Sequence, residues 1–162
     1  MKMVKLLLLL PIALLMLTSV HATTPTLVTG IFFANGPGTV TEVRTANDNL
    51  FGNATVPFTF TVRIQGVGVV SVSATLHNST GQLAAGGRIA FTGTAMGSQP
   101  GSAVILFEGM GTAAVGGSSG SFQANLVLSD GTDGLANIRG EGTLQVQSGH
   151  GTYSALVHFD PA

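Results

Sequence analysis

The chain has 162 residues, of which 44% are hydrophobic and 8% are charged, and it contains neither cysteine nor tryptophan. The absence of cysteine excludes disulfide bonds, thiolate nucleophiles and thiolate metal ligands. The few positive charges are scattered, which excludes the clustered cationic face that nucleic-acid binding requires.

Residues 1–22 have the pattern of an export signal. Lys2 and Lys5 precede an apolar run over residues 6–17, and residues 20–22 (VHA) place small side chains where a signal peptidase reads them. The run is too short to cross a bilayer core of about 30 Å as a helix. We therefore expect a signal-peptide helix that is removed, a secreted, periplasmic or extracellular location, and no stable membrane insertion after cleavage. Residues 23–162, with four arginines against seven acidic residues, are expected to form a single domain.

Alternating apolar and polar residues dominate the remaining chain. Over residues 55–65, Val56, Phe58 and Phe60 share one face, and threonines occupy the other, as in a half-buried strand. Residues 81–87 are the best helical candidate, but three glycines predict a turn there. Strands are predicted at residues 26–33, 38–45, 55–65, 70–76, 88–95, 102–108, 121–129, 140–147 and 152–160.

This rhythm of short strands and glycine-rich turns predicts an all-β fold, either a barrel or a sandwich. An open sheet this poor in lysine and glutamate would leave adhesive edges, so closure is favoured. The expected architecture is an antiparallel β-barrel of about eight strands.

Two glycine-rich segments imitate catalytic or cofactor motifs. Residues 116–120 fit G-x-S-x-G, but a predicted strand follows where a nucleophile elbow needs a helix. Residues 109–114 fit G-x-G-x-x-A, but the helix that would hold a dinucleotide pyrophosphate is missing. A hairpin turn and a bulge or tight corner are predicted instead. His77, His150 and His158 lack the spacing of metal ligands, so neither a cofactor nor a metal is expected.

Four polar residues remain as candidates for chemistry. Glu108 ends an apolar strand, and burial there would raise the pKa of its carboxyl group, whereas a position at the strand end would leave it in solvent. Arg139 and Glu141 are two residues apart, so they share one face, either lining a cavity or on the outside. Tyr153 could orient a substrate through its hydroxyl group.

The C-terminal half resembles a family of small bacterial barrels of unknown function. The resemblance rests on FEGMGTAAVGGSSGSF (107–122), GTDGLANIRGEGTL (131–144) and GHGTYSALVHFD (149–160). That family is similar to plant allene oxide cyclases and dirigent proteins. The resemblance implies an allene-oxide-cyclase-like barrel of about eight strands with a central apolar cavity, and an assembly into homo-oligomers. It transfers no catalytic residue to this chain.

Three functions follow as hypotheses. The first is a non-catalytic exported barrel that binds a small hydrophobic ligand or a partner surface. The second is a cyclase-like or isomerase-like enzyme that steers a hydrophobic substrate and uses Glu108, Arg139, Glu141 or Tyr153. The third is a structural or adhesive surface protein. A wide, purely aliphatic cavity favours a carrier, two or more inward polar side chains favour the enzyme, and a filled core favours the structural protein.

Overall fold

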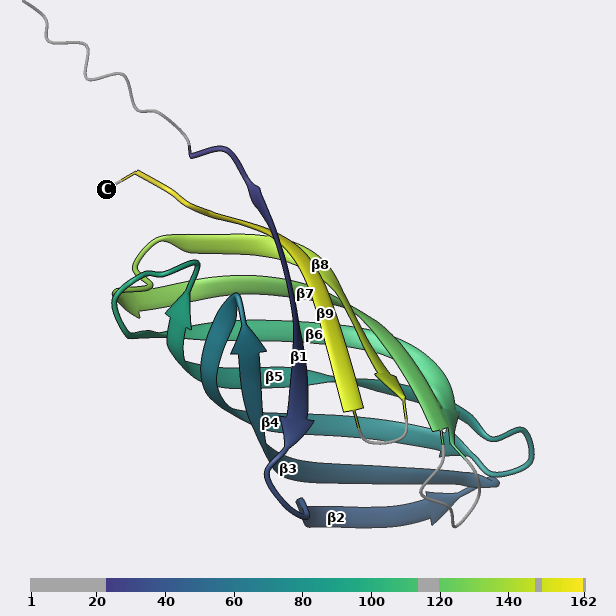
Figure 1. Ribbon diagram of the computed structural model, residues 1–162. Coiled ribbons are helices and arrows are strands. Elements are labelled where there is room, and N and C mark those ends of the chain that lie inside the picture. The colour runs from purple at the N-terminus through teal and green to yellow at the C-terminus, as the bar shows by residue number, and fades with distance from the viewer. Residues whose placement is uncertain (1–22, 114–119, 148–149, 162) are drawn as a thin grey trace, which may run out of the picture.

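The computed structural model describes residues 23–113, 120–147 and 150–161, which form one antiparallel sheet of nine strands (Figure 1). The signal segment and most of the G-x-S-x-G segment lie outside the described residues. The strands are β1 (Thr26–Ala34), β2 (Thr39–Ala46), β3 (Asn49–Val62), β4 (Ile64–His77), β5 (Gln82–Ala95), β6 (Gly101–Ala113), β7 (Gly120–Asp133), β8 (Ile138–Gln147) and β9 (His150–Phe159). Within this part of the chain, no helix is long and apolar enough to cross a membrane.

The sheet closes on itself. Consecutive strands from β3 to β9 pair as hairpins, and β1 pairs with both β9 and β3, which completes a ring of eight strands. Closing a sheet requires a stagger between its first and last strands. Following the register from Ile31 around the ring leads to Phe51 on β3, whereas Ile31 pairs directly with Thr61, ten residues away.

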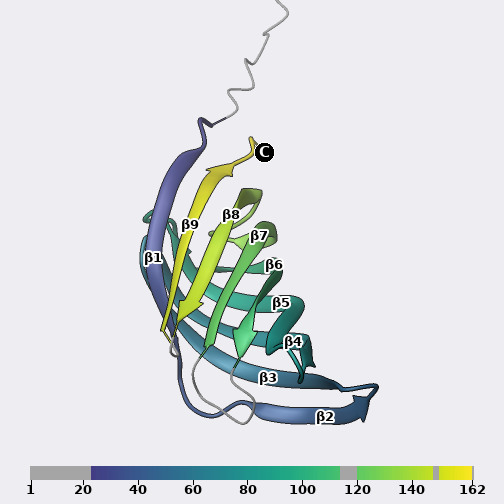
Figure 2. The same cartoon turned by 90° about the vertical axis from the view of Figure 1, so that its right-hand side faces the viewer.

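Because of this stagger, β1 pairs only with the C-terminal part of β3, and the N-terminal half of β3 extends past the end of β1. There β2 takes the place of β1 along the same edge of β3. Ala34 pairs with Phe58, and Thr39 pairs with Thr55, with residues 35–38 looping out between them. Figure 2 shows β2 at the outer margin of the sheet, beyond the closed part. The ninth strand therefore extends the ring of eight and leaves an edge of the sheet at β2.

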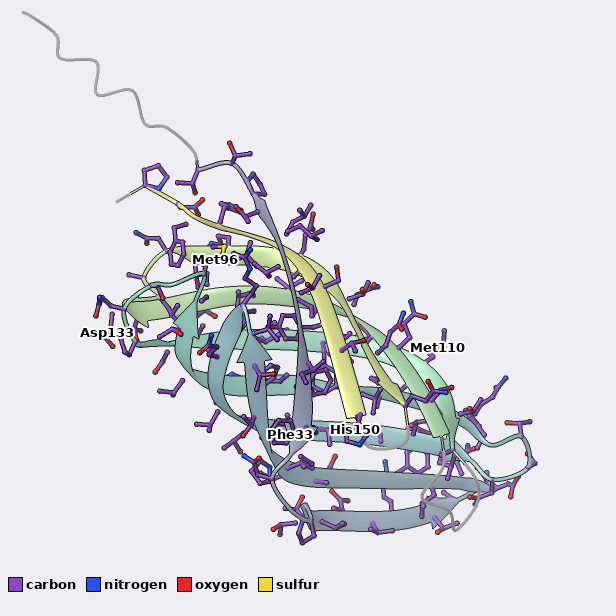
Figure 3. All side chains as sticks on the ribbon, viewed as in Figure 1. Phe33, Met96, Met110, Asp133 and His150 are labelled. Atoms are coloured by element: carbon purple, nitrogen blue, oxygen red, sulfur yellow. The ribbon has the colours of Figure 1, made fainter. Side chains whose placement is uncertain are left out.

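The two ends of the ring differ. At one end, Leu135 from the β7–β8 connection is 0% exposed and plugs the interior. Met96 and Asp133 mark this end in Figure 3. At the other end, Phe33 on β1 pairs with His150 on β9 (Figure 3), and the interior on this side contains an apolar cavity. Side chains fill the interior of the ring near Leu135, and the opposite half of the interior, called the hollow half below, contains this cavity.

Two sequence predictions about local structure are wrong. The predicted strand 55–65 runs across a hairpin, because β3 ends at Val62 and β4 begins at Ile64. The inward positions Phe60 and Ile64 keep their parity across the turn, so the alternation conceals it. Residues 82–87 lie in β5 rather than in a turn. A Cβ on Gly87 would overlap the backbone oxygen of Ser71, so the glycine permits close contact between strands.

Candidate functional site

The hollow half of the ring contains an apolar cavity of about 270 Å³. Side chains alternate between the two faces of each strand, so every second residue points into the ring. All the residues that line the cavity are apolar, and they come from β1 and from β3 to β8. They are Phe32, Val56, Phe58, Phe60, Val70, Val72, Ala74, Leu83, Ala85, Ile89, Phe107, Phe122, Leu144 and Val146.

Aromatic rings form two walls of the cavity. Phe32 stacks on Phe60 and meets Phe58 edge to face, with ring centroids 5.5 Å apart in both pairs. On another wall, Phe107 and Phe122 meet edge to face at 6.5 Å. Such contacts fix ring orientations beyond what burial alone achieves. The cavity is therefore bounded by rings that hold one another in place.

The cavity is closed at its floor and accessible at its rim. Phe60 and Ile89 at the floor are buried, whereas Phe58, Phe107 and Val146 nearer the opening are only half-buried. Below the floor the packed core leaves a space of only about 20 Å³. A molecule entering from solvent would thus meet hydrocarbon on every described side and a solid floor.

Glu108 and Glu141 lie on the outer face of the ring. On β6, Ala103 and Ile105 are buried, so the alternation turns Glu108 outward, opposite Asn125 on β7. On β8, Ile138 and Leu144 are buried and Glu141 is exposed. Neither carboxyl group lines the apolar cavity.

Arg139 is also on the outer face, and it belongs to a cluster at the C-terminal end of β9. Its Nε lies 3.5 Å from Oδ2 of Asp160, and Nε2 of His158 lies 3.2 Å from Oδ1 of the same carboxylate. The partly exposed pair of Arg139 and Asp160 contributes little to stability. Arg139 and Glu141 share one face, as predicted, and that face is the outside. No group of three or more histidine and acidic residues among the described residues converges as metal ligands.

Tyr153 is the candidate that the structure places in the interior, at the plugged end. It is 5% exposed, and its hydroxyl oxygen accepts a hydrogen bond from the backbone N–H of Ile64 at 2.9 Å. The hydroxyl group lies 3.0 Å from the carbonyl oxygen of Thr61, to which it donates. Between these residues, Val62 has a φ of +83°, which is strained for a β-branched residue. The phenol thus fastens the strained β3–β4 turn to β9.

Burial raises the pKa of Tyr153 above its ordinary value of 10.0, and the backbone hydrogen bond from Ile64 opposes this effect without cancelling it. Because the folded pKa is the higher one, the neutral phenol contributes stability that is fully present below pH 10 and is lost as the pH rises through the folded pKa. We therefore expect the free energy of unfolding to fall in alkaline solution above pH 10.

This prediction can be measured directly, because Tyr153 is the only tyrosine and the chain has no tryptophan. Phenolate absorbance should appear at higher pH in the folded protein than in the same protein in denaturant. Circular dichroism recorded in parallel should show whether ionisation accompanies unfolding. A phenol that titrates at the same pH in both states would contradict the prediction.

The sequence did not indicate which residues line the cavity. Most of them lie in predicted strands, but Leu83 and Ala85 lie in the segment predicted as a turn. The signal available was the shared face of Val56, Phe58 and Phe60, three large apolar residues in alternation. What the sequence does not contain is the register between strands, which decides which apolar faces meet.

Comparison with known proteins identifies a protein of similar fold but indicates no activity. No protein-family model matches the sequence, and no curated protein matches it significantly. Among solved structures, the chain is similar to a protein of unknown function from the DUF3224 family of Shewanella oneidensis MR-1, determined at 1.84 Å resolution. The two are 19% identical, the match covers 85% of this chain and 99% of the other, and the TM-score is 0.69. At this identity the similarity shows a shared all-β fold.

Proposed function

We propose that this protein is an exported, non-catalytic binder of small, uncharged, hydrophobic molecules, which it holds in the apolar cavity. The observation that carries the proposal is the cavity of about 270 Å³ with a lining that is apolar throughout. An interior of this kind holds ligands by burial of hydrocarbon and offers no hydrogen bond to a polar one. The export signal pattern of residues 1–22 supports an extracytoplasmic site of action.

We further propose that the closed sheet is a barrel of the allene-oxide-cyclase-like type. The ring of eight strands and its ten-residue stagger support this assignment, because barrels of about eight strands are wide enough for one small ligand. The binder is favoured over a cyclase-like enzyme because Glu108, Arg139 and Glu141 point away from the cavity and the Tyr153 hydroxyl is engaged by backbone.

The cavity volume sets the size of the ligand. A cavity of about 150 Å³ holds benzene, so about 270 Å³ suits a molecule with on the order of ten non-hydrogen atoms. A fused pair of aromatic rings or a short branched hydrocarbon has this size. For such a ligand we expect a dissociation constant on the order of 1–50 µM.

A pair of probes with the same ring system, one neutral and one anionic, tests the chemistry of the lining. We expect 2-methylnaphthalene to bind, and 2-naphthoate to bind at least about tenfold more weakly, because no lining group can pair with its carboxylate. Fluorescence titration of the purified protein measures both affinities. Equal affinities for the two probes would contradict the proposal.

A pair of neighbouring substitutions tests the location. Ala85 lines the cavity from β5, and Ala84 beside it is exposed on the outer face. Ala85→Leu adds three carbon atoms to the cavity and should lower the affinity for 2-methylnaphthalene at least about tenfold. Ala84→Leu makes the same change outside and should leave the affinity unchanged. If the two variants bind the probe equally, the ligand site is elsewhere.

A further inference from the structure

We propose that the free edge of β2 pairs with the same strand of a second copy, forming a two-fold symmetric dimer through a continuous antiparallel sheet. This inference is independent of the ligand site. It rests on three observations about β2: an unpaired edge, a charge pattern that complements itself, and an exposed apolar residue at the centre of that pattern.

The first observation is the free edge. β2 pairs with β3 on one side, and no described strand pairs with its other side. All eight of its residues are exposed, which no other strand of the described chain shows. In Figures 1 and 2 the outer side of β2 forms the margin of the sheet. Unpaired backbone groups along such an edge are a template for another strand.

The second observation is the order of charges. Glu42 and Arg44 share the outer face of β2, with Val43 between them on the opposite face. If two copies pair in antiparallel fashion about Val43, each Glu42 lies opposite Arg44 of the other copy. A slip of two residues in either direction would place Glu42 opposite Glu42 or Arg44 opposite Arg44. Opposite charges across a sheet stabilise it and like charges destabilise it, so the pattern selects one register.

Both charged side chains are already held on the outer face. Oε2 of Glu42 accepts a hydrogen bond from Nδ2 of Asn53 at 2.9 Å. The guanidinium carbon of Arg44 lies 4.5 Å from the ring centroid of Phe51. Stacking on the ring occupies the face of the guanidinium group and leaves the N–H donors at its edge for a carboxylate. Neither side chain forms an ion pair with another described residue.

The third observation is Val43, which is 60% exposed on the inner face of the sheet. In the proposed register the two copies of Val43 lie directly opposite each other on the two-fold axis. Their contact would remove both side chains from water, a gain that is absent in the monomer. Edge strands commonly carry a bulge and charges that discourage pairing, and β2 has a bulge between Val40 and Glu42. Here the charges oppose shifted registers and favour the symmetric one.

Charge reversal gives the first test. Sedimentation velocity from about 1 µM to about 1 mM covers the affinities of small interfaces. We expect the protein to dimerise, and Glu42→Arg and Arg44→Glu each to weaken the dimer at least about tenfold. An equimolar mixture of the two variants should form a heterodimer, and the double variant should recover the homodimer. Glu108→Arg, a reversal elsewhere on the outer face, is the control that should leave dimerisation unchanged.

Cross-linking gives a second test that does not depend on the loss of an interaction. Because the chain has no cysteine, Val43→Cys introduces a single thiol. Residues directly opposite in an antiparallel pair have Cα atoms about 4.5–5.5 Å apart, within the range of a disulfide. Under mild oxidation this variant should form a covalent dimer much faster than Val67→Cys, which is exposed on the outer face of β4. A monomer at about 1 mM, reversals without effect, or equal cross-linking rates would overturn the proposal.

Discussion

Truncation of Phe91 to alanine is expected to lower the free energy of unfolding by about 3–5 kcal/mol. Phe91 is 2% exposed and is the largest fully buried side chain of the core. Its ring meets that of Phe60 edge to face with centroids 5.7 Å apart. Across the sheet it pairs with Gly68 on β4 and Ala103 on β6, both of them small. Small neighbours cannot fill the space that the ring would leave, so the cavity would stay open and the cost would be high.

Phe33→Ala is the matched control, because Phe33 lies on the outer face of β1 and is 38% exposed. The same truncation there should cost no more than about 1 kcal/mol. Urea denaturation followed by far-ultraviolet circular dichroism measures both variants. Since small domains are stable by about 5–15 kcal/mol, Phe91→Ala should shift the midpoint visibly. A larger loss for Phe33→Ala than for Phe91→Ala would contradict the assignment of inner and outer faces.

The all-β class and the antiparallel arrangement could be predicted from the sequence because strand alternation is a local property. Every second residue of a half-buried strand is apolar, and Val56, Phe58 and Phe60 show this without knowledge of their neighbours. The predicted strand windows all fall on observed strands or overlap them. The extra strand beyond the ring of eight, β2, follows from the ten-residue stagger, which is a property of the closed sheet and is not encoded in any single segment.

The candidate site could not be predicted in the same way. Glu108 illustrates the reason. The residues before it form a continuous apolar run in which Ile105 and Leu106 are both large, so either face of the strand could have been the inner one. The structure buries Ile105 and exposes Leu106, which turns Glu108 outward. The cavity depends on seven strands whose inward faces meet only when the register is set.

Tyr153 shows a second limit of sequence reasoning. An isolated tyrosine among apolar residues is a reasonable candidate for an orienting hydroxyl group. Its partners, the backbone of Thr61 and Ile64, are about 90 residues away along the chain and contribute no side-chain signal. Hydrogen bonds to backbone satisfy a buried hydroxyl group without leaving a pattern in the sequence.

The junction of β1 and β9 closes the ring, and it is built from two reciprocal pairs of an aromatic residue and a glycine. Tyr153 on β9 pairs with Gly30 on β1, and Phe32 on β1 pairs with Gly151 on β9. A Cβ on Gly30 would overlap the Tyr153 hydroxyl group, and a Cβ on Gly151 would overlap the Phe32 ring. Each ring therefore lies over the glycine opposite it, which is a known way of stabilising glycine in a sheet.

Gly151→Val is expected to destabilise the protein by about 3 kcal/mol or more, because Phe32 must leave its place. Glycine costs a strand about 0.5–1 kcal/mol relative to alanine, so a side chain at an unobstructed position should stabilise instead. Gly52→Val is the control for that case, because the nearest atom to its Cβ would be the Glu42 backbone oxygen at 3.7 Å. Thermal and urea unfolding of the two variants should therefore give effects of opposite sign.

A double-mutant cycle tests whether Gly151→Val loses stability because the new side chain overlaps the Phe32 ring or because β9 is sensitive to any substitution. Phe32→Ala alone loses the buried ring, but in the Gly151→Val background it also removes the obstacle to the valine. The two changes should therefore cost less together than the sum of the single variants, by about 1–3 kcal/mol. Because Phe32 also lines the apolar cavity, Gly151→Val should weaken binding of 2-methylnaphthalene even where the protein remains folded. Strict additivity with unchanged binding would mean that the ring does not rest on Gly151 and that the closure of the sheet is held by other contacts.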